Sequence, residues 1–257
     1  MKVVLFCGGL GTRLREHSET IPKSLVNVGH RPILWNLMKY YAYYGHTDFV
    51  LCLGYRGDLI RKFFLEYDPR EAEDFVLEEG GSRLLKRTTD VADWRITFVD
   101  TGLNSNVGER LFAVRSHVQD EEIFHVNYSD QLTDLPLDKH LKAFQESRSI
   151  VSFVAVTPSQ SFHLVEFDEQ HNVTALLPVS ETRTRINGGF MLLRNSIFEY
   201  MREGEELVEE PFHRLLEEGK LTAYPYDGFW KAMDTLKEKL DYDRLDATGD
   251  RRWMVWS

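Results

Sequence analysis

Apolar runs alternate with helical patterns along the first part of the chain. Residues 2–6 form a short β-branched run typical of a buried strand, and it leads directly into glycines. After a polar loop, apolar pairs at helical spacing predict a helix whose first turn holds Pro32. The next strand is expected at 48–53 and the next helix at 58–67. This order predicts a parallel sheet with right-handed crossovers.

The same alternation continues to about residue 156, and short strands follow. We expect strands at 95–99, 123–127 and 151–156, separated by helices at 109–117 and 137–146. Further short strands are expected at 163–167, 173–177 and 189–193, with a turn at His171-Asn172, before helices at 211–218 and from Asp234 onward. No linker rich in Pro, Ser or Gly divides the sequence, so residues 1–257 are predicted to form a single domain.

Composition narrows the possible partners. The chain has 257 residues, 42% hydrophobic and 28% charged, which is ordinary for a globular protein with a sizeable core. Its longest apolar stretch, 150–156, is far short of the roughly 20 residues that span a bilayer, and the N-terminus lacks a signal-peptide pattern. We therefore expect a cytoplasmic protein with no membrane partner. The net charge of −10 also argues against nucleic-acid binding, so an anionic substrate needs a local basic pocket.

Three other features are expected to be structural. Cys7 and Cys52 lie in strand-like runs without metal-ligand spacing, which predicts buried free thiols. The tyrosines within 40–44 are expected to pack a helix against the sheet. The acidic segment 203–210 is expected to form a solvated face.

A glycine-rich loop follows the first strand, at residues 8–14. Its glycines let the backbone approach a phosphate and direct N–H groups at it, and Arg13 adds a bidentate cation. The loop after the first strand is a usual ligand site in an open α/β sheet. Leu14 replaces the third glycine of a dinucleotide fingerprint, and no Walker Gly-Lys-Ser/Thr follows. By itself the segment also fits a tight turn.

Lys23 and two aspartates add the chemistry of a phosphate site. Pro22 is rigid and places the Lys23 ammonium near the same phosphates, although alone it fits a surface lysine beside a turn. Asp130 follows a buried strand, and Asp234 begins the last predicted helix. Proteins usually hold Mg2+ with one or two carboxylates plus substrate phosphates. Taken singly, these aspartates fit a turn residue and a helix N-cap equally well.

Together these segments resemble the sugar nucleotidyltransferases, and within them the glucose-1-phosphate cytidylyltransferases. The resemblance covers nearly the whole chain and is carried by residues 8–14, 22–25, 31–35, 53–57, 100–102, 128–130, 186–190, 228–230 and 233–235. It implies an α/β fold of the nucleotide-diphospho-sugar transferase type: a mostly parallel Rossmann-like sheet flanked by helices, with a small β-rich sugar-binding lobe. Residues 1–130 would form the nucleotide-binding core, and 131–257 the acceptor-binding part and C-terminal helix.

The resemblance also implies an activity and roles for individual residues. The expected reaction is Mg2+-dependent transfer of CMP from CTP to a sugar 1-phosphate, with release of pyrophosphate, by a homo-oligomer. The catalytic residues would be Arg13, Lys23, Asp130 and Asp234, of which the two aspartates would bind the metal. Nucleotide binding would fall to Phe6, Gly8, Gly9, Leu10, Gly11, Thr12, Arg13, Lys23, Arg110 and Ser129.

Departures from the family pattern cluster on the acceptor side. Ser129 and Gln131 flank the metal aspartate where the family has glycines, and residues 176–178 lack the lysine that holds the sugar phosphate. Phe162-His163 replaces a Phe-Gly stretch beside the sugar, and Val107 replaces a threonine near the nucleotide. The acceptor is therefore expected to differ from plain glucose 1-phosphate: a modified sugar, a heptose or a smaller non-sugar phosphate. The predicted acceptor-binding residues are Gln131, His163, Arg185, Asn187, Gly188 and Trp230.

Several alternatives stay open at this point. Arg185, or else Arg183, is expected to grip the acceptor phosphate, but both fit exposed loop charges as well. His163 also fits a packed histidine at the lobe boundary. Cytosine preference rests on the resemblance alone, so a uridylyl-, thymidylyl- or guanylyltransferase is the second hypothesis. A non-catalytic homologue that binds nucleotide is the third.

Overall fold

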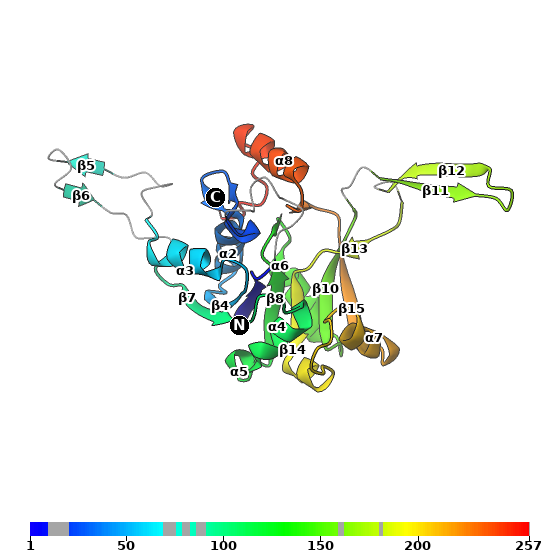
Figure 1. Ribbon diagram of the computed structural model, residues 1–257, viewed down its shortest axis with the longest axis horizontal. Helices are drawn as coiled ribbons and strands as arrows, with labels where there is room; N and C mark the ends of the chain where they lie inside the picture. The colour runs from blue at the N-terminus through cyan, green and yellow to red at the C-terminus, as the bar shows by residue number, and fades with distance from the viewer. Residues whose placement is uncertain are drawn as a thin grey trace.

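A computed structural model of the chain describes residues 1–9, 21–68, 76–78, 83–85, 91–158, 162–179 and 182–256. Leu10, Gly11, Thr12 and Arg13 of the glycine loop lie outside the described residues. In the described part, eight strands form a central sheet (Figure 1). In spatial order its path is β13 (Ile186–Asn187), β10 (Val151–Val156), β14 (Met191–Arg194), β8 (Ile123–Tyr128), β1 (Lys2–Phe6), β4 (Asp48–Leu53) and β7 (Arg95–Asp100), with β15 (Leu221–Tyr226) also paired to β10.

The first half of the chain builds a parallel sheet, as predicted. Strand β1 pairs in parallel with β4 and β8, and β4 pairs in parallel with β7. Strand β14 runs antiparallel between β8 and β10, which makes the sheet mixed on the side built by the second half. Strand β15, absent from the sequence prediction, pairs in parallel with β10. Both halves of the chain therefore contribute strands to one sheet.

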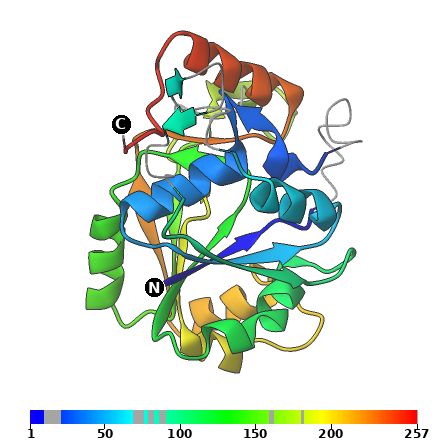
Figure 2. The same cartoon turned by 90° about the vertical axis from the view of Figure 1, so that its left-hand side faces the viewer.

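Helices cover both faces of this sheet (Figure 2). On one face lie α2 (Ile33–Tyr43) and α3 (Gly57–Leu65); on the other lie α4 (Val107–Ala113), α5 (Arg115–Val118) and α7 (Glu210–Glu217). Strand β1 shows why: Val3 and Leu5 join the apolar cluster that contains α2, whereas Val4 joins the cluster that contains α4 and α7. Successive strand residues point to opposite faces, so a strand covered on both faces is apolar throughout.

Two helix starts differ from the prediction. The single helix expected at 109–117 is two short helices, α4 and α5, which meet at Val114. Helix α4 begins earlier because Asn106 and Glu109 form a reciprocal capping box. The last helix, α8 (Leu236–Ala247), is capped in the same way by Thr235, whose side chain accepts from the N–H of Glu238. Asp234 is therefore outside the helix, and the N-cap explanation for its carboxylate is wrong.

The remaining elements are short. Helix α6 (Leu137–Glu146) matches its predicted bounds, and η2 (Lys23–Leu25) and η6 (Asn195–Glu199) are short 3-10 helices. Two-stranded pairs are formed by β2 (Asn27–Val28) with β3 (Arg31–Pro32), β5 (Val76–Glu78) with β6 (Arg83–Leu85), and β9 (Gln131–Thr133) with β16 (Trp230–Ala232). Cys7 and Cys52 are buried free thiols, and Tyr40 and Tyr41 are buried in the core, as predicted. The packing prediction is wrong for Tyr43, which is exposed. Among the described helices, none is long and apolar enough to cross a membrane.

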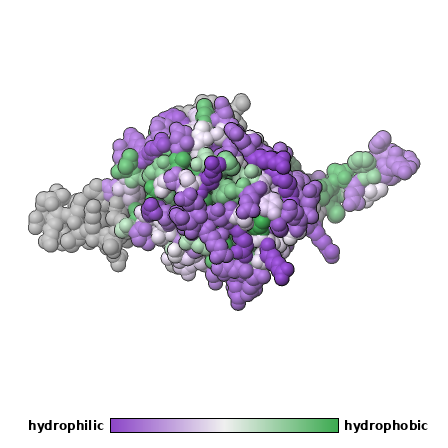
Figure 3. Space-filling view, turned by 90° about the horizontal axis from the view of Figure 1, so that it is seen from below, coloured by the Kyte–Doolittle hydropathy of each residue, from purple (hydrophilic) through white to green (hydrophobic). Residues whose placement is uncertain are grey.

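A two-stranded arm projects from the body of the molecule. It consists of β11 (His163–Phe167) and β12 (Val173–Pro178), which pair antiparallel, and it stands clear of the other elements (Figures 1 and 3). The predicted turn is confirmed, with His171 at a φ of 64°. The exposed apolar side chains of the arm region are Phe162, Leu164, Val165, Phe167, Val173, Leu176 and Leu177.

Candidate active site

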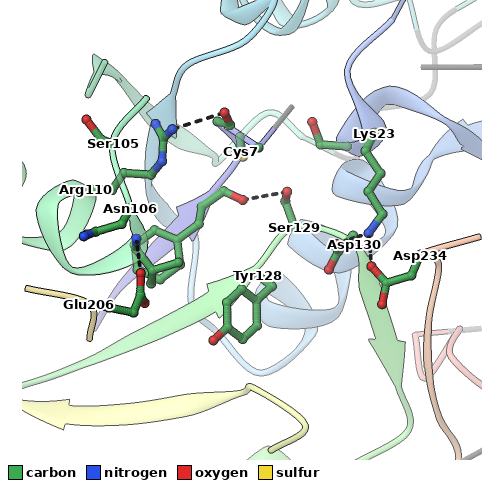
Figure 4. A pocket seen from close by; sticks show the side chains of 15 residues that line it. Cys7, Lys23, Ser105, Asn106, Arg110, Tyr128, Ser129, Asp130, Glu206 and Asp234 are labelled. Atoms are coloured by element: carbon green, nitrogen blue, oxygen red, sulfur yellow. Dashed lines mark hydrogen bonds and ion pairs between the residues drawn. The ribbon is translucent and has the colours of Figure 1, made fainter. Parts of the chain in front are cut away.

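A cavity of about 340 Å³ opens where β1 and β8 end (Figure 4). Loops at the carboxyl ends of parallel strands are the usual ligand site of such sheets. Much of the lining comes from residues that the sequence singled out: Phe6, Gly8, Gly9, Lys23, Arg110, Ser129, Asp130 and Asp234. The rest of the lining is Cys7, Ser24, Ser105, Asn106, Val107, Tyr128 and Glu206.

Lys23 joins the two predicted metal aspartates at one end of this cavity. Its ammonium nitrogen lies 2.5 Å from Oδ2 of Asp130 and 2.5 Å from Oδ1 of Asp234. Burial alone would lower the pKa of Lys23, but the two carboxylates outweigh burial and the pKa is raised. Lys23 therefore stays charged and holds together residues that lie more than a hundred positions apart.

The same pair of carboxylates fits a divalent cation. Their oxygens converge on one point, the Lys23 nitrogen, and the side chains of Asp130 and Asp234 remain 24% and 40% exposed. Asp130 is held by the β9–β16 pair, since its carbonyl accepts the N–H of Met233 at 2.9 Å. Mg2+ commonly takes one or two carboxylates and completes its octahedron with substrate phosphates and water. Asp130 and Asp234 would hold it here, and its chemistry would be to neutralise charge on phosphate oxygens.

Arg110 lies in the cavity wall, but its guanidinium is committed to the protein. It donates to Oγ1 of Thr101 at 2.8 Å and to the carbonyls of Leu53 and Gly8 at 3.2 and 3.1 Å. A Cβ at Gly8 would overlap this guanidinium, so the glycine is required for their close packing. Arg110 thus orders the start of the glycine loop, which is a different contribution from the direct nucleotide contact that the resemblance implies.

Aromatic rings and Ser129 form the middle of the cavity. The Ser129 hydroxyl donates to the carbonyl of Phe6 at 2.7 Å, which ties the end of β8 to the end of β1. The rings of Phe6 and Tyr128 lie 6.2 Å apart in a tilted arrangement. Burial, followed by the charges of Glu206 and Asp130, raises the pKa of Tyr128 to about 12, so its hydroxyl stays protonated at neutral pH.

The opposite end of the cavity holds residues that sequence reasoning missed, namely Ser105, Asn106 and Glu206. The prediction that 203–210 is a solvated face is wrong in part. Glu206 lines the cavity, and Glu205 is an ion-pair partner of Arg214, whose Nη1 donates to it at 2.9 Å. Composition could not separate these glutamates from their exposed neighbours, because only folding places this segment against α4.

The predicted acceptor residues divide into two groups. Gln131, Asn187, Gly188 and Trp230 are not part of the cavity lining, although Gln131 directly follows Asp130 and pairs with Ala232 between β9 and β16. Nε1 of Trp230 donates to the carbonyl of Gly188 at 2.8 Å. Gln131 is buried and donates to Oδ1 of Asn127 at 2.5 Å, so its amide is turned into the protein.

His163 and Arg185 lie elsewhere. His163 is exposed at the base of the arm, where its partner in β12 is Pro178, so it is not a packed boundary histidine. Arg185 donates to the carbonyls of Ala155 and Tyr226, both at 3.1 Å, and pairs with Asp227 at 2.7 Å. Neither side chain lines the cavity that holds Lys23.

The sequence and the fold both match known proteins. The sequence pattern of the family described as "Nucleotidyl transferase" matches residues 2–238. The glucose-1-phosphate cytidylyltransferase of Salmonella typhi is 32% identical over 257 residues and covers both chains completely. A Bacillus subtilis protein named "Probable glucose-1-phosphate cytidylyltransferase" is 31% identical over 258 residues, again with both chains fully covered.

Among solved structures, HddC from Yersinia pseudotuberculosis, crystallised with GMP-PN, superposes with a TM-score of 0.63. The match covers 95% of this chain and 98% of the HddC chain at 19% sequence identity, so it shows that the two proteins share a fold. The family match over nearly the whole chain agrees with a cavity that gathers a lysine and two aspartates at the carboxyl ends of β1 and β8. The chain therefore belongs to the nucleotidyl transferase family and is a sugar-1-phosphate nucleotidyltransferase.

Proposed function

We propose that this enzyme transfers CMP from CTP to a sugar 1-phosphate or related phosphate, with Mg2+ as cofactor. The observation that carries the proposal is the convergence of Lys23, Asp130 and Asp234 at one end of the cavity. Two carboxylates beside a charged lysine suit a metal–triphosphate, because the metal and the lysine together offset the phosphate charge. Support for CTP comes from the full-length likeness to proteins named as cytidylyltransferases.

In the proposed reaction, an oxygen of the acceptor phosphate attacks the α-phosphorus of CTP in line, and pyrophosphate leaves. The attacking phosphate is already ionised at neutral pH, so no general base is required. The chain contributes position and charge: Lys23 binds phosphate oxygens, Asp130 and Asp234 hold the cation, and Arg110 holds Gly8 at the start of the glycine loop. Arg13 remains a proposed triphosphate ligand outside the described residues.

The acceptor would lie beside the aspartate end, against Asn187, Gly188 and Trp230. The indole of Trp230 is fixed by its bond to Gly188 and offers an apolar face of the kind that packs on a sugar ring. We retain Arg185 as the proposed ligand of the acceptor phosphate, through the N–H groups left after its bonds to the carbonyls of Ala155 and Tyr226 and its ion pair with Asp227. His163 enters the acceptor site only if the arm changes position.

We also propose that the enzyme is a homo-oligomer. A two-stranded ribbon is marginally stable in water unless something covers it. The arm exposes Phe167, Val173 and Leu176 among its apolar side chains, and an obligate contact with a second copy would bury them. A cytoplasmic location stays a prediction from the sequence.

A pyrophosphate-release assay tests the proposed function. CTP, UTP, dTTP, GTP and ATP are crossed with a panel of sugar phosphates, heptose phosphates and small non-sugar phosphates, with and without Mg2+. Release that needs Mg2+, CTP and one class of acceptor is the expected result. Release with another nucleotide would replace CTP, and tight nucleotide binding without release from any pair would favour a non-catalytic homologue.

A further inference from the structure

The cavity has two chemically different ends (Figure 4). Lys23 with Asp130 and Asp234 forms the phosphate end, where a lysine and a cation would offset negative charge. Glu206 lies at the other end with Ser105 and Asn106. A carboxylate repels phosphates, and the nearby Arg110 guanidinium is bound to backbone carbonyls and Thr101. A nucleotide whose triphosphate lies at the lysine end therefore directs its base toward Glu206.

The fold holds Glu206 in a defined position. Its segment packs tightly on the first turn of α4, where a Cβ at Gly108 would overlap the carbonyl oxygen of Glu205. Nδ2 of Asn106 donates to the carbonyl of Gly204 at 3.1 Å, which adds a second tie between the two segments. Only glycine at position 108 permits this approach, so the carboxylate is anchored to the cavity wall.

Two backbone groups orient the carboxylate itself. The N–H of Val107 donates to Oε2 of Glu206 at 3.2 Å, and the N–H of Leu207 donates to Oε1 at 3.1 Å. An ionised carboxylate accepts about four hydrogen bonds and donates none. After these two contacts, each oxygen of Glu206 can still accept another hydrogen bond. The ionised carboxylate cannot donate one.

This chemistry separates the pyrimidine bases. Cytosine carries an exocyclic amino group that donates, whereas uracil and thymine carry a carbonyl oxygen at the same ring position. A carboxylate satisfies the amino group but leaves two acceptors facing each other when the base is uracil or thymine. We propose that Glu206 accepts a hydrogen bond from the exocyclic amino group of the base and so selects CTP over UTP and dTTP. This inference rests on the proposed nucleotidyl transfer and names the residue that reads its nucleotide.

A purely structural role for Glu206 makes a different prediction. The capping box of Asn106 and Glu109 already caps α4, and Glu206 adds one more acceptor for the N–H of Val107. If capping were its whole role, removing the charge would weaken the binding of all nucleotides alike. The ratio of the affinities for CTP and UTP therefore distinguishes recognition of the base by Glu206 from a role in capping α4.

Calorimetric titration of the full chain with CTP, UTP, dTTP and GTP in the presence of Mg2+ measures this ratio. The wild type is expected to bind CTP roughly 10- to 100-fold more tightly than UTP or dTTP, the range expected when one buried polar group is left unpaired. Glu206→Gln should reduce that preference about tenfold or more, because an amide presents either its oxygen or its NH2. Glu209→Gln is the matched control, since it removes the same charge from an exposed position in the same segment and should keep the wild-type ratio.

The outcomes separate the inference from the proposed function. Equal wild-type affinities for CTP and UTP, or an unchanged ratio in Glu206→Gln, would overturn the recognition of the base by Glu206. Pyrophosphate release in the separate assay would still support nucleotidyl transfer. GTP bound more tightly than CTP would overturn the assignment to cytosine, because guanine also offers an amino group. Failure of the wild type to bind any nucleotide, with no pyrophosphate release, would overturn the proposed function and this inference together. The wild-type ratio needs no variant, so equal affinities for CTP and UTP would overturn the inference even if Glu206→Gln folds poorly.

Discussion

Asp130→Asn separates the charge of this side chain from its shape. Asparagine keeps the size of the side chain and an oxygen that accepts from Lys23, but it removes one of the two negative charges beside the ammonium. Lys23 retains its 2.5 Å contact with Asp234, and the loss of Asp130 also relieves repulsion between the carboxylates. The asparagine oxygen still accepts from Lys23, so we expect the free energy of unfolding to fall by only about 1 to 2 kcal/mol, the difference between a hydrogen bond to a charged acceptor and one to a neutral acceptor.

The effect on turnover should be far larger. Asp130 is one of only two carboxylates at the described lysine end of the cavity, so the variant halves the anionic ligand set proposed for the cation. Removing a single preorganised charge-stabilising group commonly costs roughly a hundred- to a thousandfold in kcat. Losing a metal ligand as well should bring the total to about a thousandfold or more, equivalent to about 4 kcal/mol of barrier.

Steady-state pyrophosphate release over a range of Mg2+ concentrations measures this loss, and urea unfolding monitors the fold. The matched control is Asp138→Asn, which removes an exposed carboxylate in the first turn of α6. The control should turn over like the wild type. Near wild-type turnover of Asp130→Asn would remove Asp130 from the metal site, and a large loss of folding stability would show that its role is structural.

Further tests concern acid stability, the arm and the acceptor site. Burial lowers the pKa of His46 and His140 to about 4 and also lowers the pKa of His125 well below its usual value. The N-terminal ammonium adds to the effect on His46, and His46, His140 and the N-terminal ammonium add to the effect on His125. These rings are neutral in the folded protein, so unfolding at pH 5 should take up about two to three protons. The free energy of unfolding should therefore be highest above about pH 6.5 and fall as the pH drops toward 4. Urea unfolding between pH 7 and 5 measures the slope; His125→Leu should reduce the uptake by about one proton, and a flat profile would contradict the reasoning. On the arm, Phe167→Asp should lower the mass measured by light scattering to that of a monomer. The control Leu65→Asp changes a side chain of α3 that is 81% exposed, and it should leave the mass of the wild type unchanged. Equal masses for the two variants would exclude the arm from the oligomer interface. Arg185→Ala should raise the KM for the acceptor about tenfold or more with little change in the KM for CTP. If its acceptor saturation curve matched those of the wild type and of Arg183→Ala, Arg185 would be excluded as the phosphate ligand.

Local signals identified most elements of the fold correctly. The runs that became β1, β4 and β10 are almost entirely apolar, with one polar or charged residue each, because helices cover both faces of the sheet. Such runs are visible without any tertiary information. Strand β15 escaped prediction because Tyr224, Pro225 and Tyr226 do not form a continuous apolar run; its pairing with β10 decides its conformation. The break between α4 and α5 also has no strong local signal.

Residue types and their order along the chain indicate which chemistry is available: a glycine loop, a lysine after a proline, and aspartates after a buried strand and before the last helix. Which of these groups meet depends on the fold. Lys23, Asp130 and Asp234 come together because η2, the end of β8 and the end of β16 meet at one end of the cavity, and hydrogen bonds of 2.5 Å join them there. The same folding committed Arg110 to backbone carbonyls and brought Glu206 from an acidic run into the cavity wall. A side chain's type is local, but its partners depend on crossovers and close packing that no short stretch of sequence encodes.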